Sequence, residues 1–164
     1  MIEILDGTME TVNYFGDSRV KIYHNYENEA YPLHWHAAIE MTLCLEEDYT
    51  YSIQGKDVKL SRGDFIWLPA GALHSIYNPN NTGRRLITLF DPLILNAFTE
   101  LTPLISFLSP YYVIRANEPK TKTLHSKLQK LASDILTLEL EGSQFKNVLI
   151  YSKLIEAAAA IGNA

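Results

Sequence analysis

Three histidines and one glutamate have the types and spacing to hold a divalent metal ion. His34, His36 and Glu40 fall at even positions of one apparent strand. Because side chains alternate between the two faces of a strand, these three point to the same side. A third imidazole, His74, follows a segment punctuated by glycine and proline. Three imidazoles and one carboxylate are a suitable ligand set for a borderline divalent metal.

These residues belong to two motifs, which read His34-x-His36-(x)3-Glu40 and Gly63-(x)5-Pro69-x-Gly71-(x)2-His74-(x)3-Asn78. The motifs resemble the two signature motifs of the cupin superfamily, and the resemblance runs from about residue 33 to residue 78. One position departs from the pattern, where Glu47 replaces the usual glycine. The resemblance implies a small antiparallel, jelly-roll-like β-barrel. It also implies that His34, His36, Glu40 and His74 bind zinc, iron, nickel or manganese, although the four could form a metal-free polar floor.

The first part of the chain has the pattern of a β-barrel. Apolar residues make up 47% of the 164 residues, which suits a globular protein. Short runs rich in β-branched and aromatic residues alternate with turns about every ten residues. The predicted strands are 20–24, 39–45, 49–53, 65–68 and 84–90, with one more at 111–114. We therefore expect a mainly β barrel over residues 1–116.

Residues 117–164 are predicted to form a helical hairpin. Apolar residues recur at 4-3-4-3 spacing in the first helix and form one stripe, namely Leu124, Leu128, Leu131, Ile135 and Leu138. Gly142 ends this helix, and Ser143 is expected to cap the next. The second helix carries one apolar side, made of Phe145, Val148, Leu149, Ile155 and Ala159 together with Ser152. Further apolar residues lie off the stripe, among them Leu136, Leu140, Ile150 and Leu154, and they suggest a homodimer formed through the hairpin.

The order of a histidine-bearing barrel and then a helical hairpin resembles the N-terminal effector-binding domain of AraC-type transcription regulators. That resemblance implies a barrel that senses a small polar molecule, often a sugar, and a hairpin that dimerises. A helix-turn-helix domain would follow in such a regulator, and none fits within this chain. The net charge of −5 and the scarcity of clustered basic residues also argue against DNA binding by this part alone.

The alternative function is a metal-dependent enzyme. A metal held by three histidines and a glutamate can support dioxygenase, isomerase or decarboxylase chemistry when coordination positions remain open. The sequence shows no additional general base with a defined place in such a site. Residues that could contact the captured molecule in either function are Thr42, Tyr49, Tyr51, Trp67 and Tyr77.

The sequence predicts a cytoplasmic protein. No stretch approaches the roughly 18 apolar residues of a membrane span, and no basic region followed by an apolar run opens the chain. The single cysteine, Cys44, excludes an internal disulfide and is expected to be a buried, unreactive thiol.

Overall fold

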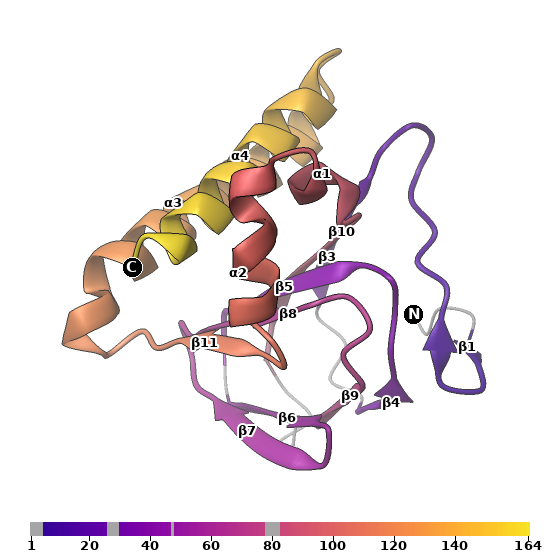
Figure 1. Ribbon diagram of the computed structural model, residues 1–164, viewed down its shortest axis with the longest axis vertical. Coiled ribbons are helices and arrows are strands. Elements are labelled where there is room, and N and C mark those ends of the chain that lie inside the picture. Colours follow the sequence, from indigo (N-terminus) through magenta and orange to yellow (C-terminus); the bar gives the residue numbers. More distant parts are fainter. Residues whose placement is uncertain (1–4, 26–29, 47, 78–82) are drawn as a thin grey trace.

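The computed structural model describes residues 5–25, 30–46, 48–77 and 83–164 (Figure 1). Glu47 and Asn78, both noted in the motifs, lie outside this part. The strands in chain order are β1 (Leu5–Asp6), β2 (Met9–Glu10), β3 (Val20–Asn25), β4 (Tyr31–His34), β5 (Ile39–Cys44), β6 (Tyr49–Ile53), β7 (Lys56–Leu60), β8 (Phe65–Leu68), β9 (His74–Tyr77), β10 (Arg85–Phe90) and β11 (Tyr112–Ile114). All the strands predicted from the pattern are present, with bounds shifted by at most one residue.

Two antiparallel sheets form the barrel walls. One has the strand order β11-β8-β5-β10-β3, and the other has the order β4-β9-β6-β7. Their inner faces enclose a core that includes Tyr49, Tyr51, Ile66 and Leu68. A separate two-stranded ribbon, β1-β2, lies beside β4 (Figure 1). The fold is therefore mainly β, as the alternation of the sequence predicts.

The central strand β5 is buried on both faces. Ile39, Met41 and Leu43 point outward into a second core, beneath the helices. Glu40 and Thr42 point into the barrel, since alternate residues of a strand face opposite sides. A strand covered on both faces reads as a continuous apolar run, interrupted here only where the barrel interior needs polar groups.

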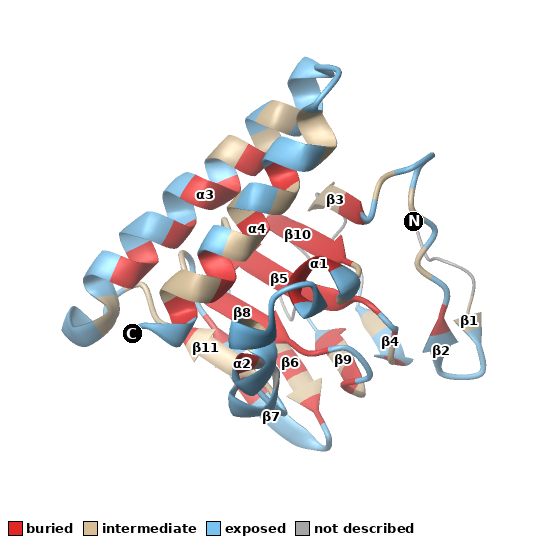
Figure 2. Ribbon diagram, turned by 45° about the horizontal axis from the view of Figure 1, so that its top comes forward, coloured by how far each residue is buried: buried red, intermediate tan, exposed pale blue. Residues whose placement is uncertain are grey.

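The helices cover the outer face of the five-stranded sheet (Figure 2). They are α1 (Leu93–Asn96), α2 (Thr102–Phe107), α3 (Lys122–Glu141) and α4 (Lys146–Gly162), with 3-10 turns at Thr99–Leu101 and Pro119–Thr121. Gly142 ends α3 in the left-handed conformation, with φ +65°, as predicted. The expected Ser143 cap is wrong, because α4 begins after Phe145 and has no side-chain cap.

The side of α4 that packs inward differs from the side that its apolar pattern suggests. Leu154 and Ile150 are 0% and 1% exposed and lie in the outer core, whereas Phe145 and Val148 are 66% and 63% exposed. The leucine stripe of α3 packs into the same core, with Leu128 completely buried. The off-stripe residues on α4 therefore pack within the chain and are not left for a partner.

Hydrogen bonds from α3 and from the segment before it reach the turn that precedes β8. His125 Nε2 donates a hydrogen bond to the Gly63 carbonyl at 2.7 Å. The buried Asp64 carboxylate accepts from Arg115 Nη1 at 2.7 Å and from the Ala116 amide at 2.8 Å. Gly63 has φ +90°, and a Cβ there would lie 2.9 Å from the Ala116 Cβ. Only glycine fits this turn, which explains its place in the second motif.

Candidate metal centre and barrel cavity

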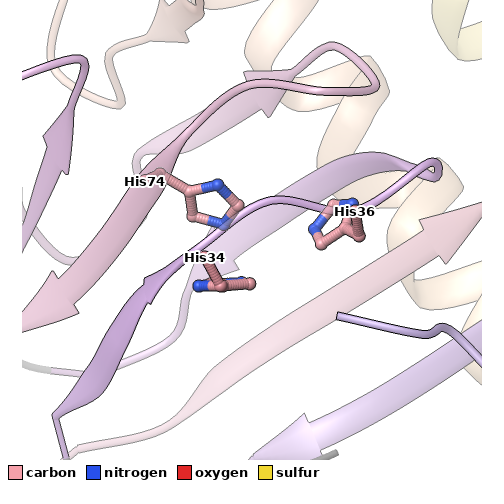
Figure 3. A group of neighbouring side chains, drawn as sticks. All are labelled: His34, His36 and His74. Carbon is pink, nitrogen blue, oxygen red and sulfur yellow. The ribbon is translucent and has the colours of Figure 1, made fainter. Parts of the chain in front are cut away.

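Three imidazoles from two strands and the loop between β4 and β5 converge inside the barrel. His34 ends β4, His36 follows it, and His74 begins β9, directly opposite His34 in the sheet register. One ring nitrogen from each histidine lies within 4.8 Å of the other two, and all three residues are buried. Figure 3 shows the rings turned toward a common point. The three histidines therefore lie together as expected, whereas the prediction that His34, His36 and Glu40 share one strand is wrong, because a loop separates β4 from β5.

Hydrogen bonds to the backbone fix which nitrogen of each ring can bind a metal. The Nδ1 atoms of His34, His36 and His74 lie 2.8–2.9 Å from the carbonyl oxygens of residues 32, 38 and 72. A carbonyl oxygen can only accept, so each Nδ1 carries a proton and donates it. In a neutral ring the lone pair then lies on Nε2, the nitrogen that faces the cluster.

Glu40 presents one carboxylate oxygen to the imidazoles. Its Oε2 lies 3.3 Å from His36 Nε2 and 3.4 Å from His74 Nε2. Its Oε1 accepts from the Thr42 hydroxyl at 2.8 Å and the Tyr51 hydroxyl at 3.1 Å. Burial, followed by the charge of Glu40, raises the pKa of Tyr51 well above its usual value, so this phenol remains a donor. The two hydroxyls therefore orient Glu40, with Oε2 left free toward the cluster.

The donor set fits a divalent metal. Two atoms that both bind one ion at about 2.1 Å lie roughly 3.0–3.4 Å apart, which matches the separations of Glu40 Oε2 from His36 and His74. His74 Nε2 is completely buried and has no hydrogen-bond partner within the described part of the chain. A buried acceptor of this kind needs a partner, and a metal ion would supply one. Three buried histidines could thus bind a metal ion, with Glu40 beside them.

A second carboxylate, Glu10, reaches the cluster from the β1-β2 ribbon. Its Oε2 lies 3.2 Å from His34 Nε2, and the side chain is 6% exposed. The ribbon is held by two backbone hydrogen bonds of 2.8 Å, from the Glu10 amide to the Trp35 carbonyl and from the Trp35 amide to the Thr8 carbonyl. Glu10 lies far outside both motifs, and no spacing in the sequence signals its place.

Glu40 and His36 shift each other's protonation. Burial alone would raise the pKa of Glu40, but the hydrogen bond from His36 and the nearby His74 imidazole hold it well below its usual value. Burial alone would lower the pKa of His36, but its hydrogen bond to Glu40 and the charges of Glu40 and Glu10 outweigh burial and raise it. In the metal-free protein His36 therefore holds its proton to a higher pH than an ordinary histidine.

This raised pKa predicts how metal affinity depends on pH. Below the pKa of His36 the ion must displace a proton, and above it no proton is displaced, so affinity falls as the pH decreases through that pKa. Because the pKa of His36 is raised, the decrease begins at a higher pH than for an ordinary histidine and approaches roughly tenfold per pH unit for one displaced proton. Chelator competition between pH 8 and pH 5.5 measures it. Constant affinity from pH 8 to pH 6 would contradict the assignment.

The cluster opens into a cavity of about 620 Å³. Its walls include His34, His36, Glu40 and Glu10 at one end. Apolar side chains of Ile76, Ile87 and Leu89 line it, and so do the buried cations Lys21 and Arg85. Its lining also includes Glu139 near the end of α3, and Lys146 and Asn147 at the start of α4. The lining of this cavity therefore includes residues from both the barrel and the hairpin.

The residues predicted to contact a ligand occupy different places. Thr42 and Tyr51 lie inside the barrel and support Glu40. Tyr49 is buried beneath Arg85, whose guanidinium carbon lies 4.7 Å from the ring centre. Trp67 faces the outer core and contacts Phe90 edge-on, because its position on β8 has the opposite parity. Tyr77 is 57% exposed, and none of the five predicted residues is among those that line the cavity.

Cys44 and His125 have structural roles. Cys44 is completely buried, and burial raises the pKa of its thiol to about 12, so the thiol is unreactive, as expected. His125 holds the hairpin against the barrel. Within the described residues, no helix is long and apolar enough to cross a membrane.

Comparison with known proteins identifies the barrel. Residues 22–90 match the family described as the cupin domain, which confirms the cupin fold. This span includes both motifs and strands β3 to β10, whereas the helical hairpin lies outside it. No curated protein sequence matches the chain.

Several solved structures resemble the barrel region. A predicted oxalate decarboxylase from Thermotoga maritima has 25% identity and a TM-score of 0.37, over 44% of this chain and 64% of that one. An RmlC-like cupin from Shewanella frigidimarina has 20% identity and a TM-score of 0.38, over 47% and 69% of the two chains. A variant of the salicylate 1,2-dioxygenase from Pseudoaminobacter salicylatoxidans, in complex with gentisate, has 18% identity and a TM-score of 0.38, over 58% and 24%. This chain thus spans less than two thirds of the Thermotoga protein.

Proposed function

We propose that the barrel captures a small polar molecule at a divalent metal held by His34, His36, His74 and Glu40, and that this capture serves sensing. The chain would then be the effector-binding domain of an AraC-type transcription regulator. The observation that carries this proposal is the cavity whose lining includes His34, His36 and Glu40 as well as Glu139, Lys146 and Asn147 of the hairpin. A ligand in this cavity can bias the position of the hairpin through direct contact.

Different residues of the barrel would bind the metal ion and orient its ligands. The three imidazoles and Glu40 Oε2 would hold the ion, and Thr42 and Tyr51 keep Glu40 in place. A bound divalent ion would supply a positive centre for oxygen atoms of the captured molecule. Burial of the cluster excludes bulk water, which strengthens each polar contact with that molecule.

A metal-dependent enzyme is the second candidate, and Glu10 is the observation in its favour. Its carboxylate lies 3.2 Å from His34 Nε2 and gives the site a second acidic group besides Glu40. Such a group can orient a substrate beside the ion or accept a proton from it. The dioxygenase, isomerase and decarboxylase classes all remain compatible with this arrangement.

One experiment separates the two candidates. A thermal-shift screen of sugars and small organic acids, on protein loaded with metal, would identify a stabilising compound. That compound is then incubated with the protein for hours, with oxygen present, and analysed by mass spectrometry. A sensor returns the compound unchanged, and hydrogen exchange slows around residues 139–147. Steady formation of product, abolished in Glu10→Gln, would establish the enzyme instead.

Dimerisation through the hairpin forms part of the sensor proposal. Phe145, Val148 and Leu149 lie at i, i+3 and i+4 at the start of α4, so they share one face, and they are 44–66% exposed. Leu140 at the end of α3 is 78% exposed. A second copy of this face is the occupant we propose, since two-fold pairing is the commonest closed arrangement.

Charge on this face should therefore separate the copies without unfolding them. The double variant Phe145→Asp with Val148→Asp is expected to be a monomer at high micromolar concentration in light scattering, while the wild type is a dimer. Leu93→Asp, at an exposed leucine of α1, is the control and should leave the dimer intact. A monomeric wild type would exclude dimerisation by this chain, although ligand capture could still occur.

A further inference from the structure

A buried guanidinium in the barrel wall is incompletely paired among the residues that the structure describes. Arg85 is 2% exposed, and its Nε and Nη1 atoms have no hydrogen-bond partner among the described residues. Its one recorded contact with an aromatic ring is to Tyr49, at 4.7 Å. The neighbouring Arg84 differs, because it forms an ion pair with Glu46 at the surface. Arg85 is thus a buried cation in which two of the three guanidinium nitrogens lack acceptors within the described part of the chain.

The strand register places Arg85 in the same lumen as the metal centre. Arg85, Ile87 and Leu89 alternate along β10 and line the cavity, opposite Cys44, Thr42 and Glu40 of β5. Leu89 lies opposite Glu40, and Arg85 is four residues before Leu89 on β10. The backbone distance between Arg85 and Leu89 is therefore about 13 Å at the usual rise of a strand. Lys21 adds a second buried cation to the wall of this cavity.

Burying a guanidinium without a full set of acceptors costs free energy of folding, and a ligand in the adjoining cavity could supply the acceptors. A buried charge without a partner destabilises the folded protein, so such groups normally pair or bind ligands. The planar fork of arginine matches a carboxylate, which can accept two parallel hydrogen bonds. The apolar wall between Arg85 and the histidines, formed partly by Ile87, suits a carbon skeleton.

We propose that Arg85 binds the carboxylate of the captured molecule. The ligand is then an organic acid whose carboxylate pairs with the guanidinium, whose carbon skeleton lies against Ile76 and Ile87, and whose other polar end faces the metal centre. This assignment rests on the proposed capture of a small molecule and names its chemical class. It applies equally to an effector and to a substrate.

Matched pairs of acids and amides test the assignment. The probes are hexanoate, phenylacetate and 4-hydroxybenzoate, each with its primary amide, and glucose and xylose as uncharged compounds, on metal-loaded protein. We expect at least one acid at millimolar concentration to raise the unfolding midpoint by several degrees, while its amide does not. The shift should disappear in Arg85→Gln, and metal content should be the same in both proteins.

Other outcomes of this screen would overturn the assignment. An amide that raises the unfolding midpoint as much as its acid would show that Arg85 does not bind a carboxylate. An acid that still raises the midpoint of Arg85→Gln would show the same. A sugar that stabilises both proteins, with no acid active, overturns the carboxylate assignment and leaves small-molecule capture intact. If neither acids nor sugars bind, the result counts against capture itself.

A measurement without ligand tests the same assignment independently. Because two nitrogens of the buried guanidinium lack acceptors among the described residues, Arg85→Met should raise the unfolding midpoint of the ligand-free protein by about 2–10 °C. Arg84→Met, at the surface ion pair, is the control and should change the midpoint little. A lower midpoint for Arg85→Met would show that Arg85 holds the barrel together, and would overturn the binding role.

Discussion

Replacing His34 and His74 together by alanine is expected to remove the metal. Protein purified without a nickel column should contain nearly one equivalent of zinc, iron, nickel or manganese by elemental analysis. The double variant removes two of the three imidazoles that meet within 4.8 Å. Loss of partners that merely orient a ligand already costs about 10–100-fold in affinity, so loss of two ligands should exceed about 100-fold.

His125→Gln is the matched control for this loss. His125 is also buried, but it bonds to the Gly63 carbonyl and lies outside the cluster. The variant should be less stable and still retain its metal, which separates destabilisation from loss of ligands. Metal content that stays unchanged in the double variant would exclude the proposed centre.

The largest expected effect on stability comes from Leu154 in α4. This side chain is 0% exposed, in the core between the hairpin and the five-stranded sheet. Leu154→Ala should lower the free energy of unfolding by about 2–5 kcal/mol, through lost burial and the cavity left behind. For a chain of 164 residues this corresponds to a midpoint lower by roughly 5–20 °C, measured by calorimetry.

Leu93→Ala provides the comparison, because Leu93 is 57% exposed at the start of α1. It should change the free energy of unfolding by less than about 0.5 kcal/mol. Similar losses in both variants would mean that α4 does not pack on the sheet as described.

The motifs carried most of what could be predicted about the metal centre. The motif spacing identified His34, His36 and Glu40 as one group, but the expected single strand is wrong, because the chain leaves β4 after His34 and Glu40 lies on β5 in the other sheet. The turn residues Gly63 and Gly71 adopt positive φ, which the sequence implies through glycine itself. Short-range patterns of this kind depend on local backbone geometry, so they can be read without knowing the fold.

Residues placed by tertiary contacts could not be predicted in this way. Glu10 reaches the cluster because the β1-β2 ribbon forms backbone hydrogen bonds with Trp35. Any residue type can form backbone hydrogen bonds, so the sequence does not reveal this contact. Arg85 looks like part of a basic pair with Arg84, yet one side chain is buried and the other forms a surface ion pair. Trp67 was expected near a ligand because it is aromatic, but the parity of β8 turns it toward the helices.

The buried side of α4 illustrates a different limit. Its apolar residues occupy more than one face, so periodicity alone does not select the face that packs. The sheet beneath it selects Ile150 and Leu154, together with the small Ala157 and Ala158. Small residues allow a helix to approach the sheet closely, and the larger apolar side chains at the start of α4 remain outside.

The shared core between the sheet and the hairpin has a consequence for synthesis on the ribosome. The last strand, β11, ends at Ile114, yet the outer face of β5 and β10 is covered only when residues as late as Ile161 are in place. A nascent chain that has completed its strands therefore still carries a bare apolar sheet. Transiently exposed surfaces of this kind are prone to aggregation, and they are the surfaces that chaperones bind.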